Sequence, residues 1–228
     1  MKKLSVIITG ATGMVGEGVL HECLKHPEVE KVLVITRHPT GYSDPKLTEI
    51  VHGDFFDLSS MIDRMKGYNA CYFCLGVTSL GKNEVEYTKL TYELTMNFAT
   101  ALASLNPGMT FCYVSGAGTD GSEKGRIMWA RVKGKTENDL LKLPFSHVYN
   151  FRPAGIVPFL KLKPSQTFYK SYKYVGWIFP VLKVIAPNYV LEMRDLAAAM
   201  INSSLVGYPG NILEVKDIKT LAKTVTIR

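Results

Sequence analysis

A glycine-rich run near the start of the chain constrains its fold more than any other feature. The run Thr9-Gly10-Ala11-Thr12-Gly13-Met14-Val15-Gly16 follows a short apolar, β-branched stretch, 4–8, and precedes a stretch, 15–25, whose apolar residues share one helical face. Glycines at such a strand-to-helix turn permit a tight turn, close approach to a phosphate and close packing of helix on strand. The N–H groups that open the helix would complete an anion site. The run therefore predicts a dinucleotide-binding turn, the alternative being a glycine-rich turn in another α/β fold.

Strand-like and helix-like runs alternate along the chain after this turn. The strand-like runs are short and rich in β-branched or aromatic residues, and they span 31–36, 48–52, 70–75, 110–114, 147–151 and 210–215. The helix-like runs span 58–65, 83–105, 127–143 and 193–205. This alternation predicts an α/β fold with a doubly wound parallel sheet of the Rossmann type. Ligands bind such sheets at the carboxyl ends of the strands, where the loops that begin at Gly10, Arg37, Gly76 and Ser115 would lie.

The alternating pattern suggests how the chain is divided. Residues 1–158 are expected to form the dinucleotide-binding core. Residues 159–228 are expected to add a small substrate-binding or lid region, then a closing helix and strand, within one structural domain. The segment 175–187 is strongly apolar and is interrupted by Pro180 and Pro187. Packing in a core or lid is the simpler interpretation, and a homodimer interface or a membrane-surface contact is the alternative.

Charge and cysteine content limit the partners and the compartment. The net charge is +7, but Lys and Arg are spread along the chain without a basic block, so no nucleic-acid partner is expected. Cys71 and Cys74 form a C-x-x-C pair that could indicate redox chemistry, yet residues three apart on a strand point to opposite faces. They are interpreted as core thiols in a reducing compartment. The strand-like run follows Met1-Lys2-Lys3 directly, which predicts no signal peptide, and the sequence as a whole predicts a cytoplasmic protein without a metal site.

Arg37 ends the second strand-like run, about twenty residues beyond the glycines. In dinucleotide-binding folds an acidic residue near this point holds the ribose 2′-hydroxyl of NAD, whereas an arginine suits the 2′-phosphate of NADP. A guanidinium can form two charge-assisted hydrogen bonds with a phosphate. Arg37 therefore favours NADP, with NAD as the second choice, unless it is simply a solvated side chain at a strand end.

Several further segments resemble the short-chain dehydrogenase/reductase superfamily, in its extended and atypical branches such as the NAD(P)-binding epimerase-like and NmrA-like proteins. The resemblance covers most of residues 3–158 and includes the Thr9-Gly10-x-x-Gly13-x-x-Gly16 spacing, Gly53-Asp54-Phe55, Leu75-Gly76-Val77, Ser115 and Arg152-Pro153-Ala154-Gly155. It implies that Asp54 and Phe55 contact adenine and that 75–77 lie beside the nicotinamide ribose. It also implies that Ser115 is the active-site serine and that the 152–155 loop flanks the nicotinamide. The cofactor-binding residues expected in all are Gly10, Thr12, Gly13, Met14, Val15, Gly16, Arg37, Asp54, Phe55, Leu75, Gly76, Val77, Lys133, Pro153 and Ile156.

The chain departs from this superfamily at its central motif, Tyr-x-x-x-Lys, where it has Trp129-x-x-x-Lys133. Residues four apart share a helix face, so the lysine charge lies beside the phenol and lowers its pKa. An indole has only an N–H donor and cannot exchange a proton in this way. Tyr87, Tyr92 and Tyr113 are candidates to replace the phenol. The alternative for this segment is a surface-helix tryptophan beside a solvated lysine.

The sequence and its family resemblance leave two functions open. One is an NADP-dependent oxidoreductase- or epimerase-like enzyme that acts on a small carbonyl or hydroxyl substrate, with Ser115, Lys133 and Trp129 as candidate catalytic residues. The other is a non-catalytic protein that senses the dinucleotide and signals through a partner. Trp129 favours the second, and Ser115 with Lys133 favours the first. Fold alone cannot decide between them.

Overall fold

The structure is a computed structural model that describes residues 3–160, 185 and 189–224. Apart from Ile185, the apolar segment 175–187 lies outside these residues. The dimer or membrane contact considered for that segment therefore stays a prediction.

Seven parallel strands form the central sheet, in the order β3-β2-β1-β4-β5-β6-β9. The strands are β1 (Leu4–Thr9), β2 (Val29–Thr36), β3 (Leu47–Val51), β4 (Ala70–Phe73), β5 (Thr110–Val114), β6 (His147–Arg152) and β9 (Ile212–Glu214). The strand order reverses direction at β1, which pairs with β2 on one side and with β4 on the other. This arrangement confirms the predicted doubly wound sheet, and it opens a ligand crevice at the carboxyl ends of β1 and β4.

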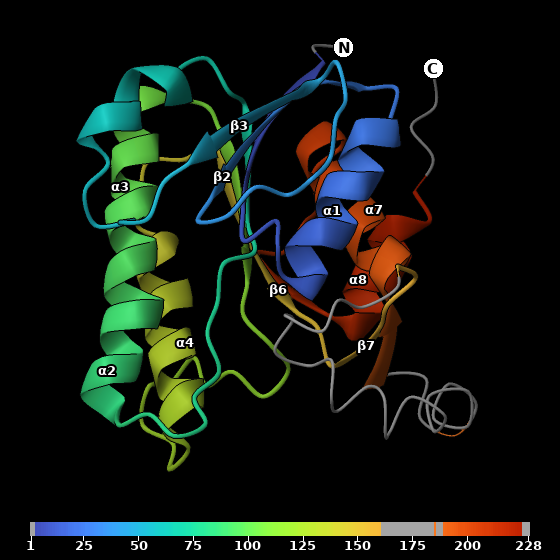
Figure 1. Ribbon diagram of the computed structural model, residues 1–228. Helices are drawn as coiled ribbons and strands as arrows, with labels where there is room; N and C mark the ends of the chain where they lie inside the picture. The colour runs from blue at the N-terminus through green and yellow to red at the C-terminus, as the bar shows by residue number, and fades with distance from the viewer. Residues whose placement is uncertain (1–2, 161–184, 186–188, 225–228) are drawn as a thin grey trace.

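Helices cover both faces of the sheet (Figure 1). One face carries α1 (Met14–Lys25), α7 (Met193–Leu205) and α8 (Val215–Ala222), and the other carries α2 (Glu84–Thr88), α3 (Leu94–Leu105) and α4 (Met128–Leu140). Each face buries its own apolar cluster, because successive strand residues point to opposite sides: Tyr72 belongs to the first cluster and Phe73 to the second. The same alternation places Cys71 in the second cluster and Cys74 against the first, and both thiols are free. The interpretation as a core thiol is confirmed for Cys71, whereas Cys74 is only partly buried at the edge of the first cluster.

Two helical segments differ from their expected form. The run predicted as a helix over 58–65 is the 3-10 helix η1 (Ser59–Met65), a form common in short connectors. The long helix predicted over 83–105 begins as expected at Asn83, whose side chain accepts a hydrogen bond from the Glu86 backbone at 2.9 Å. It is interrupted by a π-helical stretch, η2 (Lys89–Glu93), between α2 and α3. A π turn inserts one residue locally, and residue periodicity does not reveal it.

The described C-terminal residues complete the sheet and one of its helical layers. A small parallel pair, β7 (Gly155–Val157) with β8 (Val190–Glu192), leads into α7, and β9 then pairs with β6. Gly18 of α1 faces Met193 of α7, where a Cβ on Gly18 would lie 2.6 Å from the methionine Cγ. The first helix and the C-terminal helix therefore pack closely.

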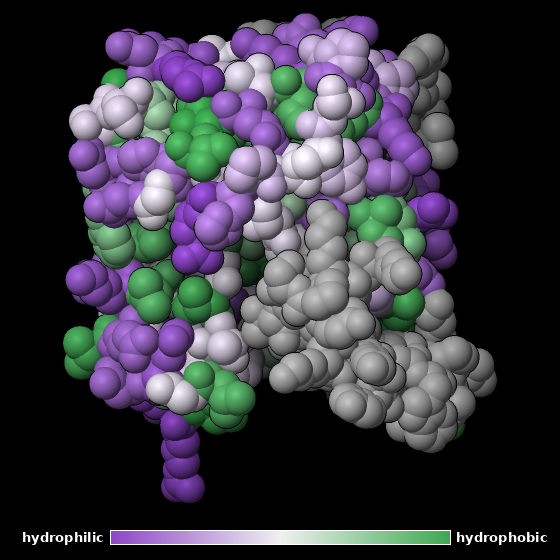
Figure 2. Space-filling view, viewed as in Figure 1, coloured by the Kyte–Doolittle hydropathy of each residue, from purple (hydrophilic) through white to green (hydrophobic). Residues whose placement is uncertain are grey.

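The face of the molecule seen in Figure 2 mixes polar and apolar side chains over its described residues. The most exposed large apolar residues within the described ranges are Leu80, Val85, Ile185 and Tyr189. No helix within the described ranges is long and apolar enough to span a membrane.

Candidate functional site

The glycine-rich turn between β1 and α1 has the geometry that its sequence predicts. Gly10 has φ +69°, and a Cβ there would lie 2.6 Å from the backbone oxygen of Cys74 at the end of β4. A Cβ on Gly16 would overlap the carbonyl group of Gly10. The backbone N–H of Gly13 donates to the Gly10 oxygen at 2.9 Å and closes the turn. The absence of side chains at Gly10 and Gly16 therefore allows β1, α1 and β4 to pack closely at this turn.

The start of α1 fits the diphosphate of a dinucleotide. The N-cap residue is Gly13, which has no side chain to cap the first N–H groups of the helix. Those groups and the positive end of the helix dipole face the crevice between β1 and β4. The geometry of the Gly10–Gly16 turn and of the α1 N-terminus therefore fits the diphosphate of a dinucleotide.

A pocket of about 370 Å³ opens at this crevice. It is lined by residues from the α1 turn, the ends of β4, β5 and β6, and α4. Ten predicted site residues line it: Gly13, Met14, Val15, Leu75, Gly76, Val77, Ser115, Lys133, Pro153 and Ile156. Two more lining residues, Ala154 and Gly155, belong to the 152–155 segment of the family resemblance, and four were not predicted: Cys74, Thr78, Val114 and Gly116. Four loops that are far apart in sequence therefore meet around one cavity.

The predicted adenine-side residues lie away from this pocket. Arg37 is exposed directly after β2, and it forms no ion pair with any residue that the structure describes. Asp54 is exposed and accepts a hydrogen bond from the Phe56 backbone at 2.9 Å. The Phe55 ring is buried against Phe98, with 6.1 Å between ring centroids, so its backbone rather than its ring would have to meet a ligand. Gly10, Thr12 and Gly16 form the turn itself and are absent from the lining.

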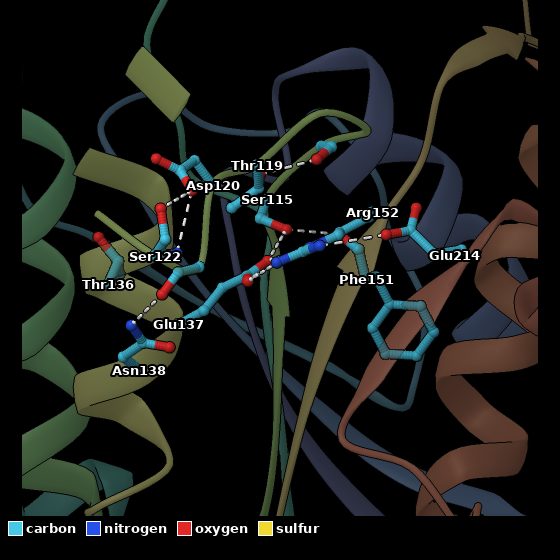
Figure 3. Close-up of polar contacts among 12 residues, drawn as sticks. Ser115, Thr119, Asp120, Ser122, Thr136, Glu137, Asn138, Phe151, Arg152 and Glu214 are labelled. Atoms are coloured by element: carbon cyan, nitrogen blue, oxygen red, sulfur yellow. Dashed lines mark hydrogen bonds and ion pairs between the residues drawn. The ribbon is translucent and has the colours of Figure 1, made fainter. Parts of the chain in front are cut away.

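Ser115 sits on a buried chain of polar contacts (Figure 3). Its hydroxyl donates to Oε1 of Glu137 at 2.5 Å, and it also lies 3.1 Å from the Phe151 carbonyl oxygen. A hydroxyl has one proton, and the charged carboxylate is the stronger acceptor. Arg152 donates to both oxygens of Glu137, at 3.0 and 2.5 Å, and to Glu214 at 3.1 Å. The serine proton is therefore directed to Glu137 rather than into the pocket.

Lys133 reaches the pocket from the first half of α4. Its Nζ donates to the Ser115 backbone oxygen at 2.5 Å, and this is its one hydrogen bond within the described part of the chain. Burial lowers the pKa of Lys133 to about 8, against the opposing effect of the Glu137 carboxylate. At pH 7 the amine is mostly charged, and it loses its proton within reach of physiological pH.

Trp129 does not line the described pocket. The residue is half-buried, and a Cβ on Gly118 would lie 3.6 Å from its Cη2 atom. The indole therefore packs beside the loop that follows β5. Its proposed place at the nicotinamide remains a prediction.

None of the three tyrosines considered as replacements lines the pocket. Tyr87 and Tyr113 are buried, and burial raises the pKa of both phenols. Tyr92 donates to Asp139 at 2.8 Å, away from the cavity. The phenol missing at position 129 has no substitute among them.

Glu137 is a site residue that sequence reasoning missed, and so is the ion pair that it forms with Arg152. Glu137 is fully buried, and Arg152 is partly buried with 13% of its side chain exposed. A signal was present, because Glu137 follows Lys133 by four residues and so shares its helix face. Without the structure, that carboxylate is indistinguishable from a solvated one.

Comparisons with known proteins support the family and the fold. The model of the NAD dependent epimerase/dehydratase family matches residues 6–138. The chain is 25% identical to "Protein fmp52-1, mitochondrial" of Aspergillus terreus over 213 residues, which cover 91% of this chain and 90% of that protein. It is 29% identical to "Protein FMP52, mitochondrial" of Debaryomyces hansenii over 157 residues, 68% and 67% of the two proteins.

Solved structures show the same fold at low identity. The Bordetella bronchiseptica enzyme WbmF in complex with NAD+ has a TM-score of 0.66 and 12% identity, covering 96% of this chain and 77% of that one. The ADP-L-glycero-D-manno-heptose-6-epimerase of Helicobacter pylori has a TM-score of 0.64 and 16% identity, covering 97% and 82%. At these identities the likeness shows the fold alone, and it confirms the predicted Rossmann architecture.

The expectation of a cytoplasmic protein is wrong. The Aspergillus terreus and Debaryomyces hansenii relatives are named mitochondrial, as is FMP52 of Saccharomyces cerevisiae, which is 27% identical over 154 residues. The expectation rested on reduced cysteines and on the residues that open the sequence. Buried thiols indicate a compartment that keeps them reduced, and they do not say which one.

Proposed function

Because this chain belongs to the NAD dependent epimerase/dehydratase family, we propose that it binds a nicotinamide dinucleotide between the Gly10–Gly16 turn and the pocket lined by Ser115 and Lys133. The observation that carries the proposal is the meeting of these parts: Gly13, Met14 and Val15 line the same cavity as Ser115 and Lys133. The diphosphate would lie on the α1 N-terminus. The adenosine would extend toward Arg37 and Asp54, which follow β2 and β3.

We propose further that the protein is an oxidoreductase- or epimerase-like enzyme for a small carbonyl or hydroxyl substrate. A bound dinucleotide would supply the hydride donor or acceptor. Ser115 would accept a hydrogen bond from a substrate hydroxyl, because its own proton is directed to Glu137. Lys133 would bind the nicotinamide ribose beside it. Apolar walls formed by residues such as Val77, Val114 and Ile156 would exclude water from the reacting atoms.

A second function is favoured by one observation. Trp129 replaces the phenol of the family motif, and Tyr87, Tyr92 and Tyr113 lie outside the pocket lining. A protein of this kind could bind the dinucleotide without turning over a substrate, and it would then act as a sensor of that dinucleotide.

Calorimetric titration of the purified full chain with NADPH, NADP+, NADH and NAD+ tests the first proposal. Saturable binding of at least one dinucleotide is expected, and no binding of any of them would overturn it. Turnover is then measured with the preferred dinucleotide against aldehydes, ketones, quinones, secondary alcohols and a sugar nucleotide. Saturable binding without turnover of any substrate would favour the sensor.

The mitochondrial names of the relatives suggest the same location for this protein. A fluorescent fusion expressed in its native cells should coincide with a mitochondrial dye. A signal spread through the rest of the cell would contradict this proposal.

A further inference from the structure

The pocket holds few groups that could exchange a proton with a substrate. Among the described residues that line it, only Cys74 and Lys133 carry side chains that titrate. Burial raises the pKa of the Cys74 thiol, so it stays protonated at neutral pH. Ser115 has a hydroxyl, but its proton is engaged by Glu137. The proton chemistry of this pocket therefore falls on Lys133.

The surroundings of Lys133 leave its Nζ available. Its hydrogen bond to the Ser115 carbonyl oxygen uses one of three N–H donors of the ammonium form. Glu137, one turn further along α4, is the carboxylate whose charge raises the pKa of Lys133. Both of its oxygens accept hydrogen bonds from Arg152, and one also accepts a hydrogen bond from Ser115. Within the described residues, Lys133 therefore has no ion-pair partner to hold its proton.

Other elements packed around Lys133 contribute no competing base. Tyr113 of β5 lies beneath the amine, with Nζ 5.9 Å from the ring centroid, and its phenol is buried and protonated. Cys74, just after β4, is also protonated. Arg152 of β6 is positively charged and is neutralised by Glu137 and Glu214 (Figure 3). Of the residues that the structure describes, Lys133 is thus the basic group that lines the cavity.

We propose that Lys133 itself, in place of the phenol missing at position 129, transfers the proton to and from the substrate oxygen. This inference rests on the proposed function, since it needs a bound dinucleotide and a hydroxyl or carbonyl substrate. In oxidation, the O–H bond breaks, the proton bonds to Nζ of the neutral amine, and the oxygen keeps the electron pair to form the carbonyl. The hydrogen on carbon leaves with its electron pair as the hydride that the dinucleotide accepts. In reduction, the Lys133 ammonium returns the proton.

Direct titration of Lys133 tests the protonation part without any substrate. The lysines of the full chain are converted to ¹³C-dimethyl-lysines, and their NMR signals are followed against pH. The Lys133 signal is identified by its loss in Lys133→Arg, and Lys135 on the same helix serves as the matched control. Lys133 should titrate near pH 8. Lys135 should titrate above the ordinary lysine pKa, because Lys135 donates a hydrogen bond to Asp139. A Lys133 midpoint as high as that of Lys135 would overturn the proposal.

Chemical rescue tests the transfer itself. Lys133→Ala should lower kcat about 10²–10⁴-fold, the usual contribution of general acid–base catalysis. Methylamine should restore part of that rate, and a series of small amines should restore it in proportion to their basicity. Wild-type oxidation should rise with pH through about 8 as Nζ loses its proton, and reduction should fall over the same range. Lys135→Arg should leave both profiles unchanged.

The alternative is that Lys133 only binds the ribose. Calorimetry of Lys133→Ala would then show a loss of dinucleotide affinity. Its kcat at saturating dinucleotide would be near that of the wild type, and added amines would not raise that kcat. That outcome would overturn the proposal and leave the proposed function standing. Failure of the wild-type chain to bind any dinucleotide is a failure of the proposed function itself, and the same calorimetry distinguishes it.

Discussion

The buried carboxylate of Glu137 is the residue on which the most polar contacts of the site converge. It accepts hydrogen bonds from Ser115 and twice from Arg152, and its side chain is only 1% exposed. A buried ion pair adds little net stability, but removing one partner leaves the other charge without compensation. Arg152 would keep only its contact with the half-exposed Glu214. Loss of the Glu137 carboxylate should therefore destabilise the folded protein, because the Arg152 charge would lose its buried partner.

We expect Glu137→Ala to lower the free energy of unfolding by about 3–5 kcal/mol, as loss of one partner of a buried pair does. Denaturant unfolding followed by circular dichroism measures this. Lys142→Ala, which removes an exposed ion pair with Asp139 on the same helix, is the control and should leave the stability almost unchanged. Equal effects of the two variants would show that the Glu137 pair is solvated.

Arg37 carries the proposed preference for NADP. Replacing it with Ala should weaken NADPH binding roughly tenfold or more, since a charge-assisted contact with the 2′-phosphate is lost. NADH binding should hardly change, because NADH lacks that phosphate. Calorimetry with both dinucleotides gives the two affinities, and Arg64→Ala, another exposed arginine, is the control. Equal weakening of both dinucleotides would contradict this role for Arg37.

At the scale of single elements, the turn between β1 and α1 could be predicted closely, and the helices less so. Glycine spacing is decisive there because Gly10 and Gly16 occupy positions that a Cβ cannot enter. The extents of η1 and of the 83–105 helix were also near their predicted bounds. Their 3-10 and π forms were not predicted, because both differ from an α-helix by a local shift in hydrogen bonding that leaves the apolar pattern almost intact.

We expect Gly16→Ala to abolish dinucleotide binding and to lower the melting temperature. Its Cβ would overlap the Gly10 carbonyl group and would push α1 away from the turn. Gly210→Ala is the matched control, since a Cβ there meets only the Ile212 oxygen at 3.8 Å. Thermal unfolding with and without NADPH measures both effects. A Gly16→Ala protein that binds NADPH normally would show that α1 can shift without loss of the site.

At the scale of the whole molecule, we propose that residues 1–158 and 159–228 form one structural unit. β9 supplies an outer strand of the sheet, and α7 and α8 cover the face that α1 shares. Leu196, Met200 and Ile218 belong to the same buried cluster as Val6 and Ile8 of β1. The sequence predicted the core, the closing helix and the closing strand, but it could not pair Glu137 with Arg152, because that contact depends on how α4 crosses β6.

A chain that ends at residue 158 should therefore lose cooperative folding. It would expose the apolar face of α1 and of the first strands, and β6 would lose its neighbour β9. Thermal unfolding of the truncated and full chains, followed by near-ultraviolet circular dichroism, measures the difference. A sharp transition in the truncated chain would contradict the proposal and show an independent N-terminal domain.

The burial of the thiols has a practical consequence. Cys23, Cys71, Cys74 and Cys112 are all free, and burial raises the pKa of each. Alkylating reagents attack thiolates, so all four should react slowly in the folded protein even though Cys74 borders the cavity. A cysteine introduced at exposed Lys124, in the loop before α4, would then be a nearly unique attachment point. A fluorophore could be attached there without prior removal of the native cysteines.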